Sequence, residues 1–149
     1  MQQMANDVKW MYGQAAISAA SNTDSDGAVL DMQDYDGAVF VVAIEDSVAT
    51  GVATMTIEQC DTSGGTYAAL SGAVATATCT VNDDLNTKLL IVDVYRPRER
   101  YLHCTLTSAT ANIAFGTQYQ FAYHGRVAPV TQITAEIAQL TKVASPAEA

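Results

Sequence analysis

The chain has 149 residues, a net charge of -9 and a pI near 4.3. This length fits one domain that can bury enough surface to fold without a metal or a disulfide. The acidic balance argues against nucleic-acid binding, and the longest apolar run, residues 37–44, is far shorter than the roughly 20 residues that cross a bilayer.

The start of the chain shows no clear hydrophobic period, so residues 1–12 are expected to form an N-terminal arm ahead of a β-sandwich domain at 13–129. It also lacks a basic region followed by an apolar stretch and a cleavage site, which argues against a secretory signal. The three cysteines, Cys60, Cys79 and Cys104, have no CxxC spacing. This usage fits reduced thiols in a protein made in the cytosol.

Short runs of strand-forming residues, separated by turn signals at intervals of about 8–12 residues, follow one another along the chain. In residues 52–59, for example, Ala53, Met55 and Ile57 alternate with polar residues and define one apolar face. The expected strands are residues 28–32, 38–44, 52–59, 73–81, 88–95, 100–107, 112–115 and 117–127. Residues 14–20 are a further candidate, as a strand or a short helix, and residues 66–70 are a candidate for a short strand. This spacing predicts an all-β fold, an antiparallel sandwich or barrel of eight or nine short strands.

Two of these strands carry a specific prediction about their faces. Residues 38–44 are continuously apolar, which predicts a strand that is covered on both sides. In residues 117–127, Tyr119 and Tyr123 share one side of the strand, whereas Gln120 lies on the other. The aromatic side is therefore expected to face the core.

The last twenty residues differ from the rest of the chain. Ile133, Ile137 and Leu140 recur at helical spacing, so residues 130–149 are expected to form a C-terminal arm or a short helix. A helix this short is marginal alone in water. The segment is therefore expected to dock on the domain, to dock on a partner, or to fray.

One polar turn has the spacing of the first half of a calcium-binding loop. Asn22, Asp24 and Asp26 alternate and Gly27 follows, which places oxygen ligands around one point. The twelfth position of such a loop, however, is Gln33 rather than a bidentate glutamate. The segment is interpreted either as a structural turn or as a weak divalent-cation site, and no other cofactor is expected.

The sequence does not point to catalysis. It has no GxSxG elbow and no Walker loop, and His103 and Cys104 are adjacent, so that on a strand they point to opposite faces. Cys79 and Cys104 fall at inward strand positions, whereas Cys60, at a strand end, is expected to be the most exposed thiol. The chain is therefore not expected to be an enzyme.

The most distinctive short segment is RPRERY at residues 96–101, which crowds three arginines into five positions. Their guanidinium groups repel one another unless carboxylates pair with them. Two readings stay open. Either Asp93 and Glu99, with acids from other strands, satisfy the arginines within the domain, or the turn docks on an acidic surface of another chain.

At this segment the chain is similar to small virion proteins of tailed phages that are encoded near the major capsid gene. The similarity is carried by LLIVDVYRPRERYLHCTLT at 89–107 and ANIAFGTQYQFAYHGRVAP at 111–129. The shared pattern is an apolar strand, an Arg-Pro turn, an Arg-Tyr-Leu run, a threonine-rich strand and a last apolar strand before a proline. Upstream, DYDGAVFVVAIED at 34–46 and VATMTIEQCDTSGGTYAAL at 52–70 match the same layout.

The resemblance implies a capsid cement or decoration protein with a jelly-roll sandwich. Such a protein acts as a homo-oligomer, here a dimer or a trimer, and clamps neighbouring major capsid subunits on the outer surface of the virion after synthesis in the host cytoplasm. It would stabilise the assembled shell because it binds only the closed arrangement, without nucleic acid or membrane as a partner. The expected capsid or subunit contacts are Trp10, Arg96, Arg98, Arg100, Tyr101, Ile133, Ile137 and Leu140.

Two other functions stay open. A neck or tail component could have the same sandwich and would be present in few copies per virion. A carbohydrate-binding sandwich for host attachment would need exposed aromatic platforms. Trp10 lies outside the expected core, and Tyr119 and Tyr123 are expected to face inward, which counts against the carbohydrate function.

Overall fold

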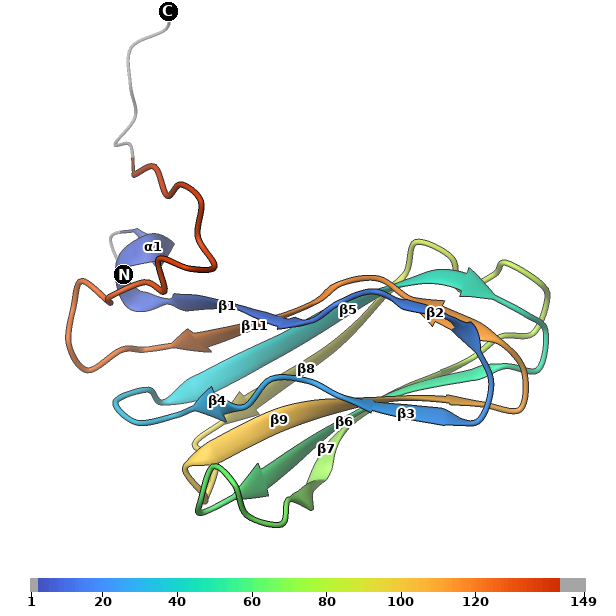
Figure 1. Ribbon diagram of the computed structural model, residues 1–149, viewed down its shortest axis with the longest axis horizontal. Helices are drawn as coiled ribbons and strands as arrows, with labels where there is room; N and C mark the ends of the chain where they lie inside the picture. The colour runs from blue at the N-terminus through green and yellow to red at the C-terminus, as the bar shows by residue number, and fades with distance from the viewer. Residues whose placement is uncertain (1–2, 143–149) are drawn as a thin grey trace, which may run out of the picture.

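The computed structural model describes residues 3–142 as two antiparallel sheets that pack face to face (Figure 1). One short helix, α1 (Met4–Asp7), precedes eleven strands. The strands are β1 (Lys9–Gln14), β2 (Ile17–Ala20), β3 (Thr23–Asp26), β4 (Leu30–Asp31), β5 (Gly37–Ser47), β6 (Val52–Cys60), β7 (Ala68–Thr78), β8 (Leu89–Tyr95), β9 (Tyr101–Ala109), β10 (Ile113–Phe115) and β11 (Gln118–Tyr123).

The first sheet has six strands in the order β1-β11-β5-β10-β2, and β8 pairs with the other edge of β5. The second sheet has five strands in the order β3-β9-β6-β7, and β4 also pairs with β9. Strands β3 and β4 both pair with β9, and β10 and β11 both pair with β5. Strands β1 and β2 pair in turn with β11 and β10, so that these three consecutive pairs each continue along one line of the sheet.

If each of these pairs is counted as one interrupted strand, the eleven strands occupy eight positions, four in each sheet. The first sheet then reads β1/β2, β10/β11, β5, β8, and the second reads β3/β4, β9, β6, β7. Two four-stranded sheets that exchange the chain in this order form a jelly roll. The expected all-β, antiparallel, jelly-roll-like sandwich is therefore confirmed.

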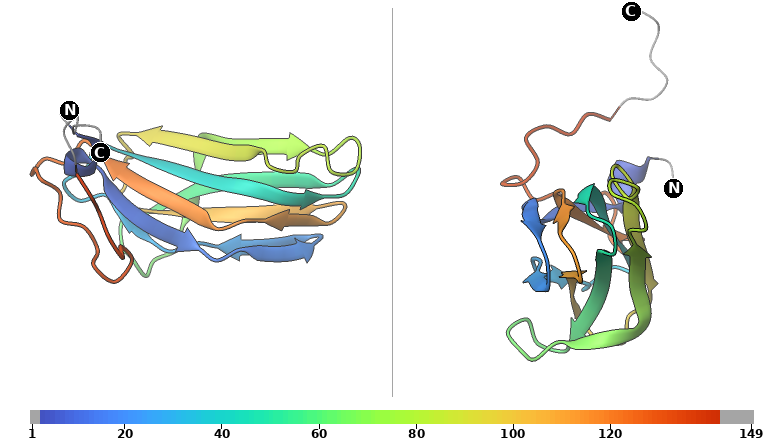
Figure 2. Two further views of the ribbon diagram at one scale, coloured as in Figure 1. Left: turned by 90° about the horizontal axis from the view of Figure 1, so that it is seen from above. Right: turned by 90° about the vertical axis from the view of Figure 1, so that its right-hand side faces the viewer.

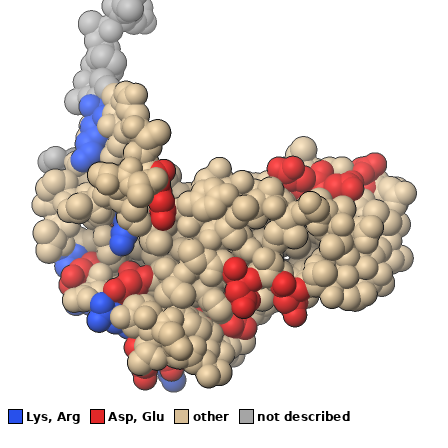
Figure 3. Space-filling view, viewed as in Figure 1, with Lys and Arg blue, Asp and Glu red and all other residues tan. Residues whose placement is uncertain are grey.

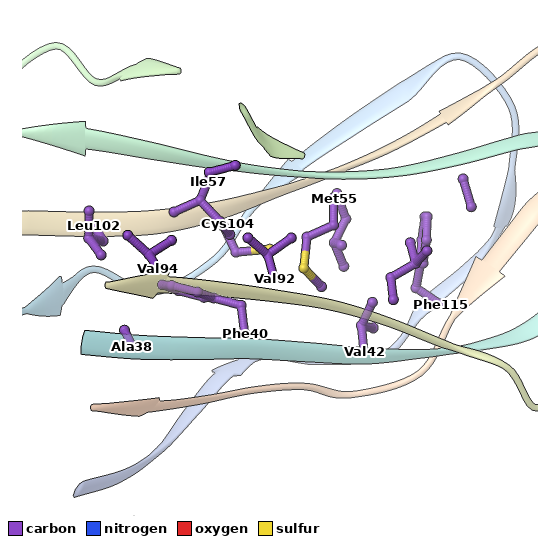
Figure 4. Packing of buried hydrophobic residues seen from close by; sticks show 14 of the residues in the cluster. Ala38, Phe40, Val42, Met55, Ile57, Val92, Val94, Leu102, Cys104 and Phe115 are labelled. Atoms are coloured by element: carbon purple, nitrogen blue, oxygen red, sulfur yellow. The ribbon is translucent and has the colours of Figure 1, made fainter. Parts of the chain in front are cut away.

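The core lies between the sheets and is built from alternate residues of the longest strands. Phe40 and Val42 of β5 face Met55 and Ile57 of β6, and all four side chains are almost fully buried (Figure 4). The alternation expected for residues 52–59 is confirmed because the pleat sends every second side chain inward.

The prediction that β5 is covered on both sides was wrong. Its inward residues are buried, but Val39, Val41 and Ala43 on the outer side are only half-buried. Strand β8 shows the same pattern, since Leu89 and Ile91 are more than half exposed. The first sheet therefore carries apolar residues on both of its sides.

The expected N-terminal arm differs from the structure. Residues 9–12 belong to β1, so the boundary drawn at residue 12 cuts through a strand that pairs with β11. The C-terminal segment was expected to be an arm or a short helix, and its described part, residues 131–142, contains no helix. The Ile133 carbonyl accepts hydrogen bonds from the Glu136 N–H at 3.1 Å and the Ile137 N–H at 3.0 Å, which make a single turn. Residues 143–149 lie outside the described residues. Within residues 3–142, no helix is long and apolar enough to cross a membrane.

Candidate functional site

The outer side of the first sheet is dominated by large apolar side chains, which we call the apolar face. Figure 2, left, looks onto this side of the sheet. Five of its members, each close to half exposed, are Tyr12 (45%), Leu89 (57%), Ile91 (53%), Tyr95 (56%) and Tyr119 (47%). The half-buried members are Trp10, Val39, Val41 and Phe121.

Strand register arranges the apolar face in rows. Tyr12 lies opposite Tyr119, Tyr119 opposite Val41, and Val41 opposite Ile91, so that one row crosses four strands. Residues directly opposite each other on one side of a sheet have their Cβ atoms only about 5 Å apart. The row is therefore a continuous apolar surface rather than a set of isolated side chains.

Aromatic rings hold two neighbouring parts of this surface together. The rings of Trp10 and Phe121 are 4.8 Å apart at 72°, and those of Tyr12 and Tyr119 are 6.2 Å apart at 89°. Edge-to-face geometry of this kind is favourable for aromatic pairs. The rings are therefore fixed in orientation before any partner binds.

The predicted orientation of β11 was wrong. Gln118 and Gln120 point into the sandwich and are fully buried, whereas Tyr119 points outward. Gly13 makes room for one of the glutamines, because a Cβ at that position would overlap the Gln118 side chain. The Gln120 amide donates to the Ala28 carbonyl at 3.1 Å, which compensates part of the cost of its burial.

One carboxylate interrupts the apolar face. Asp93 of β8 lies opposite Val39 of β5, and its carboxylate accepts a hydrogen bond from the Tyr123 hydroxyl at 2.7 Å. Desolvation of the phenol, together with this hydrogen bond, raises the pKa of Tyr123 well above its usual value. Because the phenol keeps its proton, the Tyr123–Asp93 pair holds one negative charge rather than two.

Residues 131–142, which we call the C-terminal arm, run along the open edge of β1. The Gln132 side chain accepts a hydrogen bond from the Trp10 N–H at 3.1 Å and donates one to the Val8 carbonyl at 2.7 Å. The Glu136 carboxylate accepts a hydrogen bond from the Tyr12 N–H at 2.8 Å. Two side chains thus replace a neighbouring strand and protect an edge that would otherwise be open to pairing.

The arm also borders a groove of about 340 Å³ above β1 and β11, where Ile137 and Leu140 face Trp10, Tyr119 and Phe121. A second apolar hollow of about 370 Å³ lies on the other side of Trp10. Of the predicted contact residues, the structure therefore brings Trp10, Ile137 and Leu140 together. Ile133 is half-buried in the same arm but does not line the groove.

The arginine turn lies apart from this groove, between β8 and β9. Arg100 forms a bidentate pair with Asp31, with Nε to Oδ1 at 2.8 Å and Nη2 to Oδ2 at 2.7 Å. The hydrogen bond from Arg100 lowers the pKa of Asp31 below its usual value. For Arg100 the partner is therefore an acid from another strand, as one of the two readings allowed, and not Asp93 or Glu99.

Two arginines of the turn, Arg96 and Arg100, also lie over aromatic rings. The guanidinium of Arg96 lies 5.1 Å from the centre of the Tyr95 ring, and that of Arg100 lies 5.0 Å from the Tyr101 ring. Arg98 borders an open polar hollow of about 480 Å³. In Figure 3 the basic side chains in view gather at the end of the sandwich that carries both termini, close to acidic ones. This end is therefore mixed in charge rather than purely basic.

The calcium-like segment is a strand and not a loop. Asp24 and Asp26 lie on β3, where they accept hydrogen bonds from Thr107 at 2.7 Å and Thr105 at 2.8 Å. Asn22 precedes the strand with a φ of 55°. Across residues 3–142, no three His, Cys, Asp or Glu side chains are placed to hold a metal ion. Strand spacing holds the two carboxylates apart instead of converging them.

The outer side of the second sheet is polar. It carries the pairs of threonines and carboxylates just described. The Nε2 atom of His103 lies 2.7 Å from Oε2 of Glu58, and the His103 ring stacks on the Tyr67 ring with 4.2 Å between the ring centres. The thiols offer no reactive group on either sheet, because all three cysteines are free and buried. Cys60 is the most exposed of the three, as expected, although its exposure is only 8%, and burial raises the pKa of Cys104 to about 12.

Sequence reasoning therefore located several residues of the apolar face but not the face itself. Leu89, Ile91 and Tyr95 were assigned to a strand without a prediction that they point outward. The signal was present in β8, where every residue from Leu89 to Ile91 is apolar although a sheet strand has only one inward side. No protein-family model matches the sequence, and a search of curated proteins finds no match.

Proposed function

We propose that this chain is a structural protein of a tailed-phage virion, which binds the outside of the capsid as an oligomer and clamps neighbouring major capsid subunits. The observation that carries the proposal is the continuous apolar face on one sheet of a jelly roll. Contiguous exposed apolar patches of this kind are typical of interaction surfaces rather than of solvent-facing sheets.

Two further features support a binding role. The C-terminal arm and α1 flank the apolar face, so that a partner would meet a shaped surface and not a flat one. The arginine turn presents Arg98 beside Glu99 and Arg126 at the end of the sandwich, which suits a polar contact with another folded surface. The similarity of residues 89–107 to phage virion proteins supplies the choice of partner.

The proposal is tested by cryo-EM of the particles with which the protein co-purifies. We expect density for the sandwich repeated over the outer shell, in contact with major capsid subunits. Absence from the shell would overturn the proposal. Density confined to one vertex, at about a dozen copies or fewer, would instead assign the chain to the neck or tail.

A second candidate, carbohydrate binding for host attachment, gains support from the orientation of β11. Tyr119 was expected to face inward and to offer no platform, yet its ring and that of the neighbouring Tyr12 are about half exposed on the apolar face. Exposed aromatic rings can stack on sugars. Screening of the purified protein on a glycan array tests this candidate: binding that is lost in Tyr119→Ala would favour it, and no binding to any glycan would reject it.

A further inference from the structure

We propose that the apolar face is the contact between two copies of this chain, which pack against each other sheet on sheet. This inference rests on the proposed function in one respect: it says which surface joins the copies in the proposed oligomer. It concerns the isolated protein and can be tested without a virion.

Charge decides which surface two copies can share. Each copy has a net charge of -9, so that most approaches between copies are repulsive. The outer side of the second sheet carries Asp24, Asp26 and Glu58, and both ends of the sandwich carry charged side chains. On the apolar face Asp93 is hydrogen-bonded to Tyr123, and the Glu136 carboxylate of the arm lies at the β1 edge, where it accepts a hydrogen bond from the Tyr12 N–H. The apolar face is therefore where like-charged copies repel each other least.

The chemistry of the face also fits a second copy. Interfaces between permanently associated copies are more apolar than those between proteins that fold separately and then meet. The uncovered part of the face centres on Val41 and Ile91, beside Tyr119 and Leu89, where the arm leaves the surface free. Two such surfaces related by a two-fold axis would be self-complementary, and stacked sheets leave about 10 Å between them for the side chains.

The size of the face agrees with this contact. Strand β8 has 7 residues, which at about 3.3 Å each gives a length of about 23 Å, and four strands at about 4.8 Å give a width of about 19 Å. The resulting plane of about 440 Å² includes the β1 and β11 part that the arm borders, and it is little more than half of the roughly 800 Å² that each partner contributes to a standard interface. The relief of the side chains, and Leu140 on the flanking arm at 38% exposure, add to it.

The test is the mass of the full-length protein by sedimentation equilibrium from about 1 µM to about 100 µM, a range in which micromolar association is measurable. We expect an oligomer for the wild type, and at least a tenfold weaker association for Ile91→Arg. Ile91 is 53% exposed, so the substitution should leave the fold intact, and Leu89→Arg at 57% exposure provides a second variant. Val74→Arg is the matched control, because Val74 is 48% exposed on the outer side of the second sheet.

A wild type that stays monomeric at all concentrations would overturn the inference, as would an oligomer that Ile91→Arg and Leu89→Arg do not weaken. Cosedimentation with purified capsids separates this inference from the proposed function. An oligomer that depends on Ile91 but does not bind capsids supports the inference while the proposed function fails. A monomer that binds capsids through Ile91 overturns the inference, because the occupant of the face is then a capsid subunit.

Discussion

The two sheets of this sandwich have similar inner sides and very different outer sides. The inner sides of both are apolar and buried. The outer side of the second sheet is covered with hydrogen-bonded polar pairs such as Thr107 with Asp24 and Thr54 with Thr76. The outer side of the first sheet repeats large apolar residues across four strands. A sandwich needs only its inner sides to fold, so an apolar outer side indicates a requirement beyond folding.

The second sheet shows how the same architecture is built for contact with water. Its outward threonines fit the pleated backbone and satisfy carboxylates on the neighbouring strand. The first sheet places valine, leucine and isoleucine at equivalent positions. The difference between the two outer sides therefore singles out the apolar face of the first sheet as the candidate interaction surface.

The largest expected effect on the free energy of unfolding comes from the inner sides of the two sheets, which are both apolar and buried. Phe40→Ala in the first sheet is expected to lower the free energy of unfolding by about 3–5 kcal/mol, and Met55→Ala in the second by about 2–5 kcal/mol, because each leaves a cavity. Thr54→Ala, on the outer side of β6, is the control and should cost less than about 1 kcal/mol. Chemical denaturation measures all three; a large loss for Thr54→Ala would show that the outer side also carries the fold.

The next effect concerns the carboxylate on the apolar face. Tyr123→Phe removes the donor to Asp93 and is expected to cost about 1 kcal/mol at neutral pH. Since folding raises the pKa of Tyr123, its contribution to stability is present below the unfolded value of about 10 and is lost as the pH rises above it. Unfolding curves from neutral to alkaline pH should therefore converge for wild type and variant. A gap that stays constant up to high pH would contradict the assignment.

A smaller effect is expected at the mixed-charge end. Folding lowers the pKa of Asp31, so its contribution to stability is present above the unfolded value of about 3.9 and is lost as the pH falls through the folded value. Asp31→Asn should lower the melting temperature by at most about 2 °C at neutral pH, because the pair is exposed to solvent. The difference should vanish in acid. Asp34→Asn, a neighbouring carboxylate, is the control for the change in net charge.

The smallest effect on stability is expected for the arm. Glu136→Ala removes the acceptor of the Tyr12 N–H and should cost less than about 1 kcal/mol. Trp10 is the one tryptophan of the chain and lines the groove beside Ile137, so that its fluorescence reports on the arm. We expect its emission to shift toward longer wavelength in Glu136→Ala but not in Thr134→Ala, whose side chain is exposed. An unchanged spectrum in Glu136→Ala would mean that the arm stays docked without this bond.

The sequence predicted the inward sides of β6 and β9 better than those of β5 and β8. In β6 and β9 the apolar residues alternate with threonines and other polar residues, so that the buried side of each strand can be read directly. In β5 and β8 the runs are apolar on both sides, and the pattern does not tell which side faces the core. For this reason the apolar face could not be predicted, although β5 and β8 contain more apolar residues than one buried side needs.

Strand β11 and the arginine turn show what only tertiary structure decides. Hydropathy alone places Tyr119 inward and Gln118 outward, but pairing with β5 fixes the opposite orientation, and Gly13, more than a hundred positions away, leaves the space that a buried glutamine needs. Arg100 likewise finds its carboxylate at Asp31, on another strand, and not among its sequence neighbours.

Sequence alone was enough for the class of the fold and the positions of most strands, because alternation is a local property of the chain. Turn residues were a weaker guide, since the expected polar turn at residues 22–27 contains strand β3. Tertiary structure decided which side of each apolar strand became the core and which stayed exposed. It also placed the C-terminal arm on the edge of β1. These outcomes depend on which strands become neighbours, and a local pattern that is apolar on both sides is compatible with either orientation.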